Sequence, residues 1–512
     1  MTRRDLGTAL AGGIEGAQAL RYLTGVVLDA LAAGATERGG PLPPGGHGAV
    51  ESRVRAACSP ALPERGSGAD YALRTLVRAA AHGAADPSDP RCAAHLHCPP
   101  LAVAAAADLA ASALNPSLDS WDRGPAAGVV EREVTDAVAA LVYPLLPQAD
   151  ALVTSGGTES NLVALLLARE RARAAGRRTV QVVCGANAHH SVHRAAWMLG
   201  LPTPLLVECA GGRMIPAALD RTLAECGSRV PALVVATAGT TDEGMVDPLP
   251  ELGQVAATHG AELHVDAAYG GPLLFSGRLA GRLEGIDGAV SVALDLHKLG
   301  WQPVAAGLLA VADAGQLEHL SLRADYLDAE DDTDAGMPDV LGRSVRTSRR
   351  ADALKIAVTL RALGRAGLAE LVERCVDAAG ELAGAVREHP ALRLRPGEVG
   401  ISTVLFRPTD ADALPEERGD ALVAGVRRRL LAEGRAVLGR GVAEDADGRD
   451  RLWLKATLLH PHAERGDLEG LLQQVADAAE AVREAETVGA ADAVDDVPAN
   501  AVAGGEERGE VR

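Results

Sequence analysis

The sequence contains few aromatic residues and very few lysines. Phe, Trp and Tyr make up 2% of the 512 residues, and among the 50 basic residues lysine occurs only at Lys298, Lys355 and Lys455. Arginine therefore supplies nearly all the positive charge, which suggests a specific role for a retained lysine. A lysine amine can lose its proton and form a Schiff base, whereas a guanidinium cannot. The alternative for any one lysine is an ordinary surface charge.

Long apolar runs and a positive charge balance are also missing. The longest apolar stretch, residues 101–114, is too short to cross a bilayer and contains Asp108. The net charge of −19 argues against nucleic acid or an anionic membrane as a partner. Seven scattered cysteines indicate a reducing compartment, and no unbroken apolar core follows the N-terminus as in a signal peptide. We expect a cytoplasmic protein.

The order of helical and strand patterns predicts four segments. Residues 1–90 read as helices, at residues 14–33 and 69–82, separated by Gly- and Pro-rich breakers, and form an arm too small to have its own core. Residues 91–330 form a large α/β domain, and residues 331–485 a small C-terminal α+β domain. Residues 486–512 lack apolar periodicity, so we expect a disordered tail.

Strands alternate with helices inside the large domain. This alternation predicts a mostly parallel sheet covered on both faces, in which ligands bind beyond the carboxyl ends of the strands. Helices are expected at residues 162–175 and 249–259. Strands are expected at residues 151–154, 179–184, 232–236, 261–265, 289–294 and 307–311.

Two predicted strand ends carry a lysine and a glycine-rich turn. The strand that ends before Asp295-Leu296-His297 delivers Lys298 to the edge of the sheet. After the strand expected at residues 151–154, Gly156, Gly157 and Thr158 precede a helix, where free N–H groups favour an anion such as phosphate. A plain capped turn is the alternative, and neither the Walker nor the Rossmann glycine pattern is present.

Further strand ends carry a carboxylate, a histidine and a threonine. Asp266 follows an apolar strand, where a carboxylate is costly unless it is paired, and a protonated pyridine nitrogen is a suitable partner. An ordinary hydrogen-bonded Asp is the alternative. His189 could stack on a flat ring, and the turn that contains Thr241 offers hydroxyl groups to an anion. Together with Lys298 these groups describe a pyridoxal-phosphate site.

A compact cluster of Cys92, His95, His97 and Cys98 has the residue types of a metal site. Its spacing is too compressed for the usual tetrahedral pairs, and no second cluster completes it. We predict a turn that lines a pocket and no metal.

The chain resembles the group II pyridoxal-phosphate decarboxylases at residues 154–169, 189–195, 237–249, 264–270 and 295–298, within a region of about 90–480. Residues 94–99, 115–122, 324–327, 347–350 and 454–459 are most similar to 2,4-diaminobutyrate and siderophore-pathway lysine decarboxylases. The resemblance implies a type I aminotransferase-like fold and a homodimer with sites at the interface.

The resemblance also implies roles for individual residues. Lys298 would hold the cofactor, Asp266 would pair with its ring nitrogen, and His189 would stack on the ring. The other implied contacts are Gly157 and Thr158 with phosphate, Ser291 and His297 nearby, Ala268 against the ring face, and Thr241 beside the substrate.

This chain also departs from the family pattern. Asp295-Leu296 replaces the Asn-Pro that often precedes His-Lys in the family. Val340 stands where the aromatic branch has a tyrosine in a loop, and the nearest tyrosine in this chain is Tyr326. His460 stands where related chains often have Asn.

We therefore expect α-decarboxylation of an L-amino acid, as part of amino acid metabolism. A diamino acid such as 2,4-diaminobutyrate, lysine or ornithine is the expected substrate. Another type I pyridoxal-phosphate reaction, such as transamination, and a cofactor-binding homologue without turnover remain alternatives.

Overall fold

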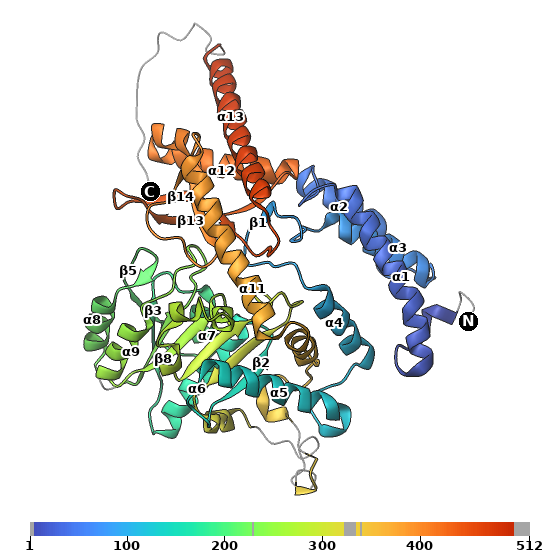
Figure 1. The fold of residues 1–512 in the computed structure, drawn as a ribbon, viewed down its shortest axis with the longest axis vertical. Helices are drawn as coiled ribbons and strands as arrows, with labels where there is room; N and C mark the ends of the chain where they lie inside the picture. The colour runs from blue at the N-terminus through green and yellow to red at the C-terminus, as the bar shows by residue number, and fades with distance from the viewer. Residues whose placement is uncertain (1–4, 228–229, 322–333, 338–339, 496–512) are drawn as a thin grey trace, which may run out of the picture.

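The computed structural model describes residues 5–227, 230–321, 334–337 and 340–495. Figure 1 shows a large α/β domain, a smaller domain above it, and a helical arm that stands to one side. Among the described residues, none of the helices is both long and apolar enough to cross a membrane.

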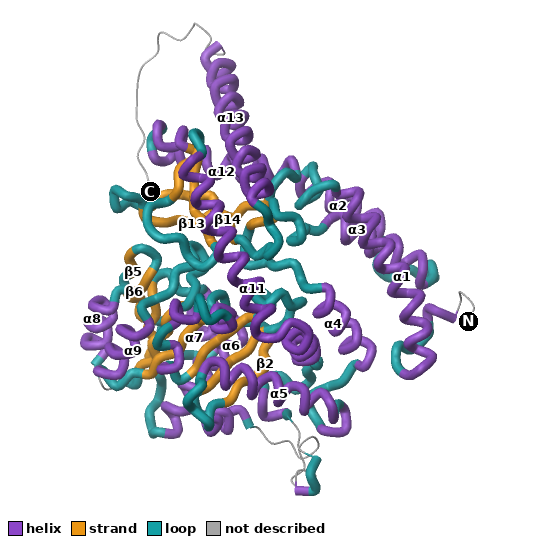
Figure 2. The backbone as a smooth tube through the Cα atoms, in the orientation of Figure 1, coloured by secondary structure: helices purple, strands orange, loops and turns teal. Residues whose placement is uncertain are grey.

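A seven-stranded sheet forms the centre of the large domain (Figure 2). Its strand order is β2-β10-β9-β8-β7-β3-β4. β10 is antiparallel to both of its neighbours, and the other pairs are parallel, so the largely parallel sheet expected from the sequence is confirmed. The strands are β2 Asp150–Thr154, β3 Gln181–Gly185, β4 Leu205–Val207, β7 Ala232–Thr237, β8 Glu262–Ala267, β9 Ser291–Asp295 and β10 Gly307–Val311.

Both faces of this sheet are covered because its strands are apolar on both sides. On one face, α6 Gly157–Ala174 and α7 His190–Met198 pack on residues such as Leu152, Leu233 and Val235. The other face meets the main core, which includes residues of α5 Pro125–Val142, α8 Pro216–Cys226 and α9 Leu249–Thr258. β2 ends at Thr154 and α6 begins at Gly157, so the N-terminus of α6 lies at the carboxyl edge of the sheet.

The small domain contains a second sheet, in the order β1-β13-β14-β12-β11. Its first strand, β1 Cys92–Ala93, comes from the beginning of the predicted large domain and pairs in parallel with β13 Val437–Glu444. The remaining elements are β11 Leu392–Leu394, β12 Thr403–Pro408, β14 Asp450–Thr457, α12 Glu416–Glu433 and α13 Arg465–Asp495.

One long helix joins the two domains. α11 Ala353–Glu388 is interrupted at Gly364, whose φ of 63° only glycine adopts readily. Ile356 and Leu371 pack in the core of the large domain, whereas Leu382 and Val386 pack in that of the small domain. The segment boundary at residue 331 therefore does not separate the two cores.

The N-terminal arm is helical, as expected. It consists of α1 Gly13–Arg38, α2 Gly46–Cys58 and α3 Ala69–Gly83, followed in the chain by α4 Ala102–Leu114. The sequence pattern indicated α1 and α3 but not α2, which buries none of its residues.

The C-terminal segment differs from the expectation. α13 continues to Asp495, so the disordered tail predicted from residue 486 does not begin there. The helix continues because Ala- and Glu-rich sequence favours helix. Residues 496–512 lie outside the described part of the chain.

A buried ion pair fixes the segment before α11 against α5. Both Arg349 and Glu131 are buried, and Arg349 Nη1 and Nη2 each donate to one Glu131 carboxylate oxygen at 2.8 Å. Removing one partner leaves the other charge buried and unpaired, whereas replacing both with apolar residues removes that cost.

Arg349→Ala should therefore lower the free energy of unfolding by about 3 kcal/mol, measured by urea denaturation. The double variant Arg349→Leu/Glu131→Leu should recover most of the loss. Arg173→Ala, which removes an exposed pair with Glu170, is the control and should change stability by less than about 1 kcal/mol. An Arg349→Ala protein as stable as this control would show that the pair does not stabilise the fold.

Candidate active site

A cavity of about 480 Å³ lies at the carboxyl ends of the strands. Most of the predicted site residues line it, although they come from five separate stretches of the chain. These lining residues are Gly157, Thr158, His189, Thr241, Asp266, Ala268, His297 and Lys298. The structure therefore brings together eight of the nine residues that the sequence singled out.

Lys298 follows β9 and enters the cavity beside an acidic group. Its Nζ lies 3.1 Å from Asp295 Oδ2, and His297 Nε2 lies 3.4 Å from the same oxygen. The turn is held from outside by Cys98, whose thiol donates to the His297 carbonyl oxygen at 3.2 Å. Of the three lysines in the chain, Lys298 is thus the one that is partly exposed and lines the cavity.

Asp266 is the penultimate residue of β8 and is 6% exposed. Its Oδ2 accepts a hydrogen bond from Asn161 Nδ2 at 2.8 Å, and its Oδ1 accepts from the Ala268 backbone N–H at 3.1 Å. Both donors are neutral, so the negative charge of this buried carboxylate is not cancelled by them. The arrangement fits a carboxylate that pairs with a cationic group in the cavity.

Behind Asp266, a chain of buried polar groups fixes two side chains at once. His264 Nδ1 contacts Ser291 Oγ at 2.8 Å, and His264 Nε2 donates to Asn161 Oδ1 at 3.0 Å. Asn161 Nδ2 also donates to Ser191 Oγ at 2.9 Å, and Ser191 Oγ contacts His189 Nδ1 at 2.8 Å. The Ser191 backbone N–H also donates to His189 Nδ1, so His189 carries its proton on Nε2.

Burial keeps the histidines of this site neutral. It lowers the pKa of His264 to about 4, despite the opposing effect of Asp266, and it lowers the pKa of His189 as well. The pKa of His297 falls to about 4, chiefly by burial and secondarily by the charge of Lys298. Each histidine is therefore a neutral hydrogen-bonding group near pH 7.

The start of α6 provides the groups expected for an anion. Gly157 begins the helix, so the first backbone N–H groups have no partner within it. A Cβ at Gly156 would lie 2.8 Å from His297 Cε1, and one at Gly157 would lie 2.7 Å from Ala268 Cβ, so both positions require glycine. Glu159 holds the preceding turn, because its Oε2 accepts from the Ser155 N–H at 2.7 Å.

Ser291 is the predicted site residue that the structure places elsewhere. It begins β9, while Asp295 ends the strand at the cavity, so four residue steps of about 3.3 Å separate them. Ser291 does not line the cavity and instead orients His264. Its expected contact with phosphate is therefore corrected to an indirect, structural position.

The Cys92–Cys98 turn lines the cavity through Leu96, and Cys98 contacts the turn that carries Lys298. Burial raises the pKa of the Cys98 thiol to about 12, so it is not a thiolate. Across the described residues, no group of three or more His, Cys, Asp or Glu side chains could hold a metal ion.

Val340, Tyr326 and His460, which concern departures from the family pattern, lie away from the cavity or outside the described residues. Val340 lines a separate cavity of about 240 Å³ with Leu118 and Trp121. Tyr326 lies outside the described residues. His460 Nδ1 accepts from the His462 N–H at 3.2 Å, in a turn before α13.

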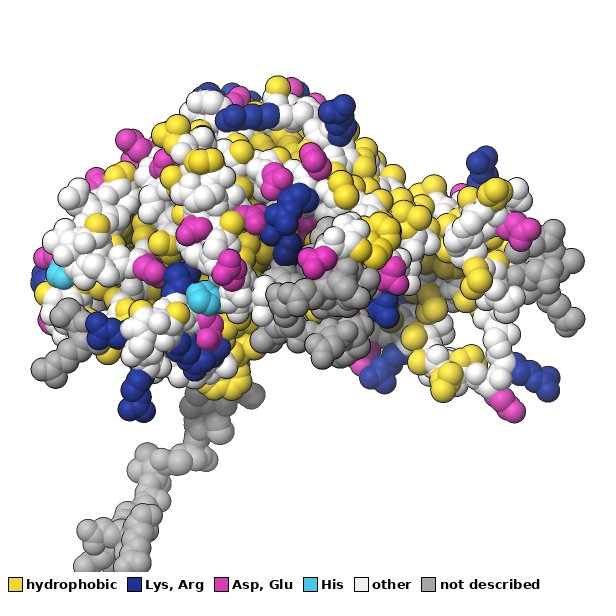
Figure 3. Space-filling view, turned by 90° about the horizontal axis from the view of Figure 1, so that it is seen from below, with side chains coloured by type: hydrophobic (Ala, Val, Ile, Leu, Met, Phe, Trp, Pro, Cys, Tyr) yellow, Lys and Arg dark blue, Asp and Glu magenta, His cyan; other side chains and the backbone are white. Residues whose placement is uncertain are grey.

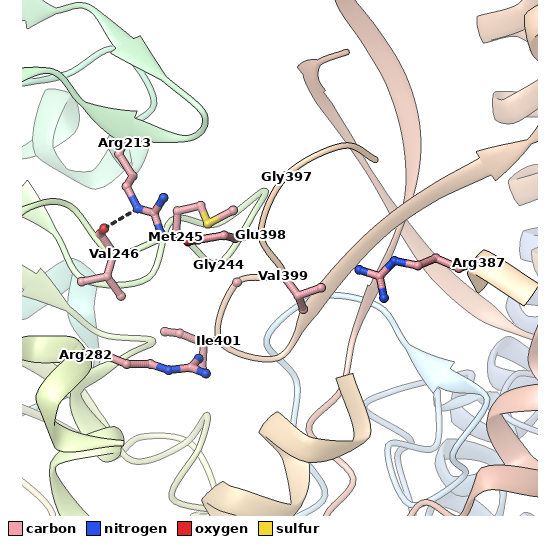
Figure 4. Close-up of a pocket in the computed structure, with 11 residues that line it drawn as sticks. Arg213, Gly244, Met245, Val246, Arg282, Arg387, Gly397, Glu398, Val399 and Ile401 are labelled. Atoms are coloured by element: carbon pink, nitrogen blue, oxygen red, sulfur yellow. Dashed lines mark hydrogen bonds and ion pairs between the residues drawn. The ribbon is translucent and has the colours of Figure 1, made fainter. Parts of the chain in front are cut away.

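Another cavity, of about 490 Å³, opens where the two domains meet (Figure 4). Arg213, Arg282 and Arg387 reach it from three different elements. Arg213 already donates to the Val246 carbonyl oxygen at 3.0 Å and pairs with Glu398. This cavity has no lysine, no histidine and none of the predicted site residues, so it is not the candidate active site.

Pyridoxal phosphate fits the groups of the first cavity. Its aldehyde requires an amine, which Lys298 supplies, and its basic ring nitrogen requires a carboxylate, which Asp266 supplies. Its phosphate requires the free N–H groups at the start of α6. The small side chain of Ala268 and the imidazole of His189 leave space for a flat ring.

Sequence reasoning missed Asn161, Ser191 and His264. Positional signals could have found two of them: Asn161 lies one helical turn after Gly157, and His264 lies two residues before Asp266 on the same face of β8. Polar residues at these apolar-facing positions indicate a buried hydrogen-bond network.

The neutral state of His264 makes stability depend on pH. In the native protein, His264 becomes protonated only near pH 4, whereas a histidine in the unfolded chain becomes protonated near pH 6.5. Stability should therefore fall as the pH drops from 6.5 towards 4, by up to about 3 kcal/mol for this group, with no effect above that window.

Urea denaturation across this range should show a shallower fall for His264→Gln than for the unsubstituted protein. His47→Gln is the control, because the His47 side chain is 90% exposed, and it should leave the slope unchanged. Parallel curves for His264→Gln and the unsubstituted protein would contradict the assignment.

Comparison with known proteins agrees with this geometry. The family model described as "Pyridoxal-dependent decarboxylase conserved domain" matches residues 53–409. The L-2,4-diaminobutyrate decarboxylase of Rhizobium meliloti (strain 1021) is 41% identical over 431 residues, covering 83% of this chain and 84% of that protein. The L-2,4-diaminobutyrate decarboxylase of Acinetobacter baumannii is 31% identical, covering 84% and 88%.

Solved structures show the same fold. The glutamate decarboxylase domain of diaminobutyrate-pyruvate transaminase and L-2,4-diaminobutyrate decarboxylase from Vibrio parahaemolyticus superposes with a TM-score of 0.80 at 29% identity, covering 93% of this chain and 98% of that one. The Oryza sativa TDC structure with PLP and tryptamine has a TM-score of 0.81 at 22% identity, covering 91% and 98%. The expected type I aminotransferase-like fold is confirmed.

The matched model covers most of the chain, and the relatives match over most of their own length. The resemblance seen in the sequence is therefore confirmed. The chain belongs to the pyridoxal-dependent decarboxylase family, whose members are carboxy-lyases that use pyridoxal 5'-phosphate to remove the α-carboxylate of an amino acid.

Proposed function

We propose that this protein decarboxylates L-2,4-diaminobutyrate at Cα and releases 1,3-diaminopropane and carbon dioxide. The observation that carries the proposal is the 41% identity to a named L-2,4-diaminobutyrate decarboxylase over 83% of the chain. The composition of the cavity supports the same class of substrate.

The cavity contains no arginine among its described lining residues, and Lys298 is its one lysine. A substrate with a second carboxylate, such as glutamate, needs a cation for that group, since a buried carboxylate without a partner is costly. Lys298 is committed to the cofactor, so the described lining residues of this chain leave no cation for an acidic side chain. This charge balance favours a basic side chain over an acidic one.

The residue roles in cofactor binding follow from the positions described above. Lys298 would hold the aldehyde carbon, Asp266 the ring nitrogen, and the first N–H groups of α6 with the Thr158 hydroxyl the phosphate. Ala268 and His189 would lie against the ring. His297 is held as a neutral group between Asp295 and the Ala306 N–H, which donates to His297 Nδ1 at 3.4 Å.

When bound, pyridoxal phosphate supplies an electron sink for the bond that breaks at Cα. The task of Asp266 is to keep the ring nitrogen protonated, and its two neutral donors fix the direction of its oxygens without cancelling its charge. His189 presents a proton on Nε2 at the cavity, because Nδ1 accepts from Ser191. Leu96, Ala268, Val304 and Ala305 form apolar lining, which favours loss of the charged carboxylate.

We further propose that the protein works as a homodimer in the cytoplasm. The arm has few contacts with the rest of the chain and exposes apolar side chains, including Leu28 and Leu31 on one side of α1. Apolar side chains also gather on the lobe at the right of Figure 3, which is the arm. At the cavity, Val304 is 73% exposed, a position that a second subunit could cover. The seven cysteines are free thiols, in keeping with a reducing compartment.

Purified enzyme with pyridoxal phosphate should release carbon dioxide and 1,3-diaminopropane from L-2,4-diaminobutyrate. We expect kcat/KM for glutamate to be at least about 10²-fold lower, because its side-chain carboxylate would be left unpaired. Product amines and keto acids are identified by mass spectrometry, which also separates decarboxylation from transamination. Lys298→Ala should lose both the Schiff-base absorbance and turnover, whereas Lys355→Arg should retain the absorbance. Keto acid in place of amine, or no product from any amino acid, would refute the proposal.

Light scattering in solution should give twice the mass of one chain. Leu28→Glu/Leu31→Glu should shift the protein towards the monomer, because both carboxylates would enter the proposed interface. Val442→Glu, at an exposed apolar position of β13, is the control and should leave the mass unchanged. A monomeric unsubstituted protein with full activity would rule out the dimer.

A further inference from the structure

Asp295 is a second buried carboxylate in the active site, and the mechanism above gives it no role. It ends β9 and is 2% exposed. Its Oδ2 is paired with Lys298 Nζ at 3.1 Å, whereas its Oδ1 is buried without any hydrogen-bond partner. A buried carboxylate oxygen without a partner is uncommon and indicates a group that is completed by a ligand.

The unpartnered oxygen lies at the turn proposed to bind phosphate. A Cβ built on Gly156 would lie 3.4 Å from Asp295 Oδ1, and one built on Gly157 would lie 3.4 Å from Asp295 Oδ2. The carboxyl group therefore lies against the first turn of α6, where the free N–H groups are expected to hold the phosphate. An anion bound there would meet this carboxyl group directly.

The charges around Asp295 are few. Lys298 and His297 face it from its own turn, Asp266 faces it from β8, and the Gly157 N–H faces it from α6. His297 is neutral near pH 7, so Lys298, which pairs with Asp295, is the one cation among these groups. Burial raises the pKa of Asp295 to about 6, and Lys298 opposes this rise.

Attachment of the cofactor changes this balance. To react with the aldehyde, the Lys298 ammonium must first lose a proton, and Asp295 Oδ2 is the nearest carboxylate oxygen to its Nζ. The free amine then forms a C–N bond, and the aldehyde oxygen leaves as water. An ionised Asp295 would afterwards face the phosphate dianion without its former counter-ion, which is strongly unfavourable in a buried site.

We propose that Asp295 accepts the Lys298 proton when the cofactor binds and then, as a neutral carboxylic acid, donates a hydrogen bond to the cofactor phosphate. Asp295 is thus the counter-ion of Lys298 in the apoenzyme and a phosphate ligand in the holoenzyme. The protonated carboxyl group satisfies the unpartnered oxygen and removes the repulsion from the dianion. The inference depends on the proposed attachment to Lys298, but not on the identity of the substrate.

Two properties of Asp295 make the inference testable without measuring turnover. A neutral carboxylic acid has an infrared carbonyl band that an ionised carboxylate lacks. Asparagine has the same shape, is always neutral and also donates a hydrogen bond, so Asp295→Asn imitates the proposed holoenzyme state. Asp295→Ala removes the donor altogether.

Infrared difference spectra of apoenzyme before and after addition of pyridoxal phosphate should show a new carboxylic acid band that shifts in D₂O. The band should be absent from Asp295→Asn and present in Asp220→Asn, a control at an exposed carboxylate. If the unsubstituted enzyme gains no such band, Asp295 is ionised in the holoenzyme and the inference is wrong.

Cofactor affinity should respond to pH in a way that depends on Asp295. Between about pH 6.5 and 8.5 the dissociation constant of the unsubstituted protein should rise about tenfold per pH unit relative to that of Asp295→Asn, because Asp295 keeps the Lys298 proton in the protein whereas Asp295→Asn must release that proton to solvent. Asp295→Ala should bind weakly throughout. Equal pH dependence in the unsubstituted protein and Asp295→Asn would overturn the inference.

A Lys298→Ala protein separates this inference from the assignment on which it depends. If that variant keeps the Schiff-base absorbance, the attachment to Lys298 is wrong. If the absorbance is lost but the pH dependence of cofactor binding does not differ between the unsubstituted protein and Asp295→Asn, only the role of Asp295 is wrong. Thermal melting of each variant checks that the fold is retained.

Discussion

The site depends on keeping one carboxylate, Asp266, charged inside the protein. A buried charge is tolerated only where hydrogen bonds direct it and a counter-ion is available. Asn161 and the Ala268 N–H provide the direction without neutralising the charge, and the counter-ion is left to the ligand. The remaining polar groups, from Ser291 through His264 to Ser191, hold Asn161 and His189 in one arrangement.

The sheet explains how these groups meet. Parallel pairing of β7, β8 and β9 brings their carboxyl ends to one edge, and the two-residue period places His264 with Asp266, and Ser291 with Asp295, on the side that faces α6. The same geometry places Ser291 at the distant end of its strand. The position of the site therefore follows from the direction of the strands and from the alternation of their side chains between the two faces of the sheet.

The positions of the strands and of their carboxyl ends could be predicted from the sequence. The expected strand at residues 307–311 coincides with β10, and the ends of β8 and β9 placed Asp266 and Lys298 correctly at the cavity. The helix α2 was missed because it buries no residue, and the shared helix α11 fell wholly within the predicted small domain because a sequence pattern does not show which core a helix face meets. Asn161 and His264 were missed because a buried polar contact depends on tertiary packing.

Charge balance connects the choice of substrate to the anchoring of the cofactor. The cavity lining contains two carboxylates and one lysine among its described residues, and that lysine is consumed when the cofactor is attached. The phosphate adds further negative charge, so the occupied site has an excess of anions. Two adjustments reduce this excess: a carboxyl group that becomes neutral at the phosphate, and a substrate whose side chain is cationic. An acidic side chain would add to the excess, so the feature that requires Asp295 to be protonated also selects against acidic amino acids.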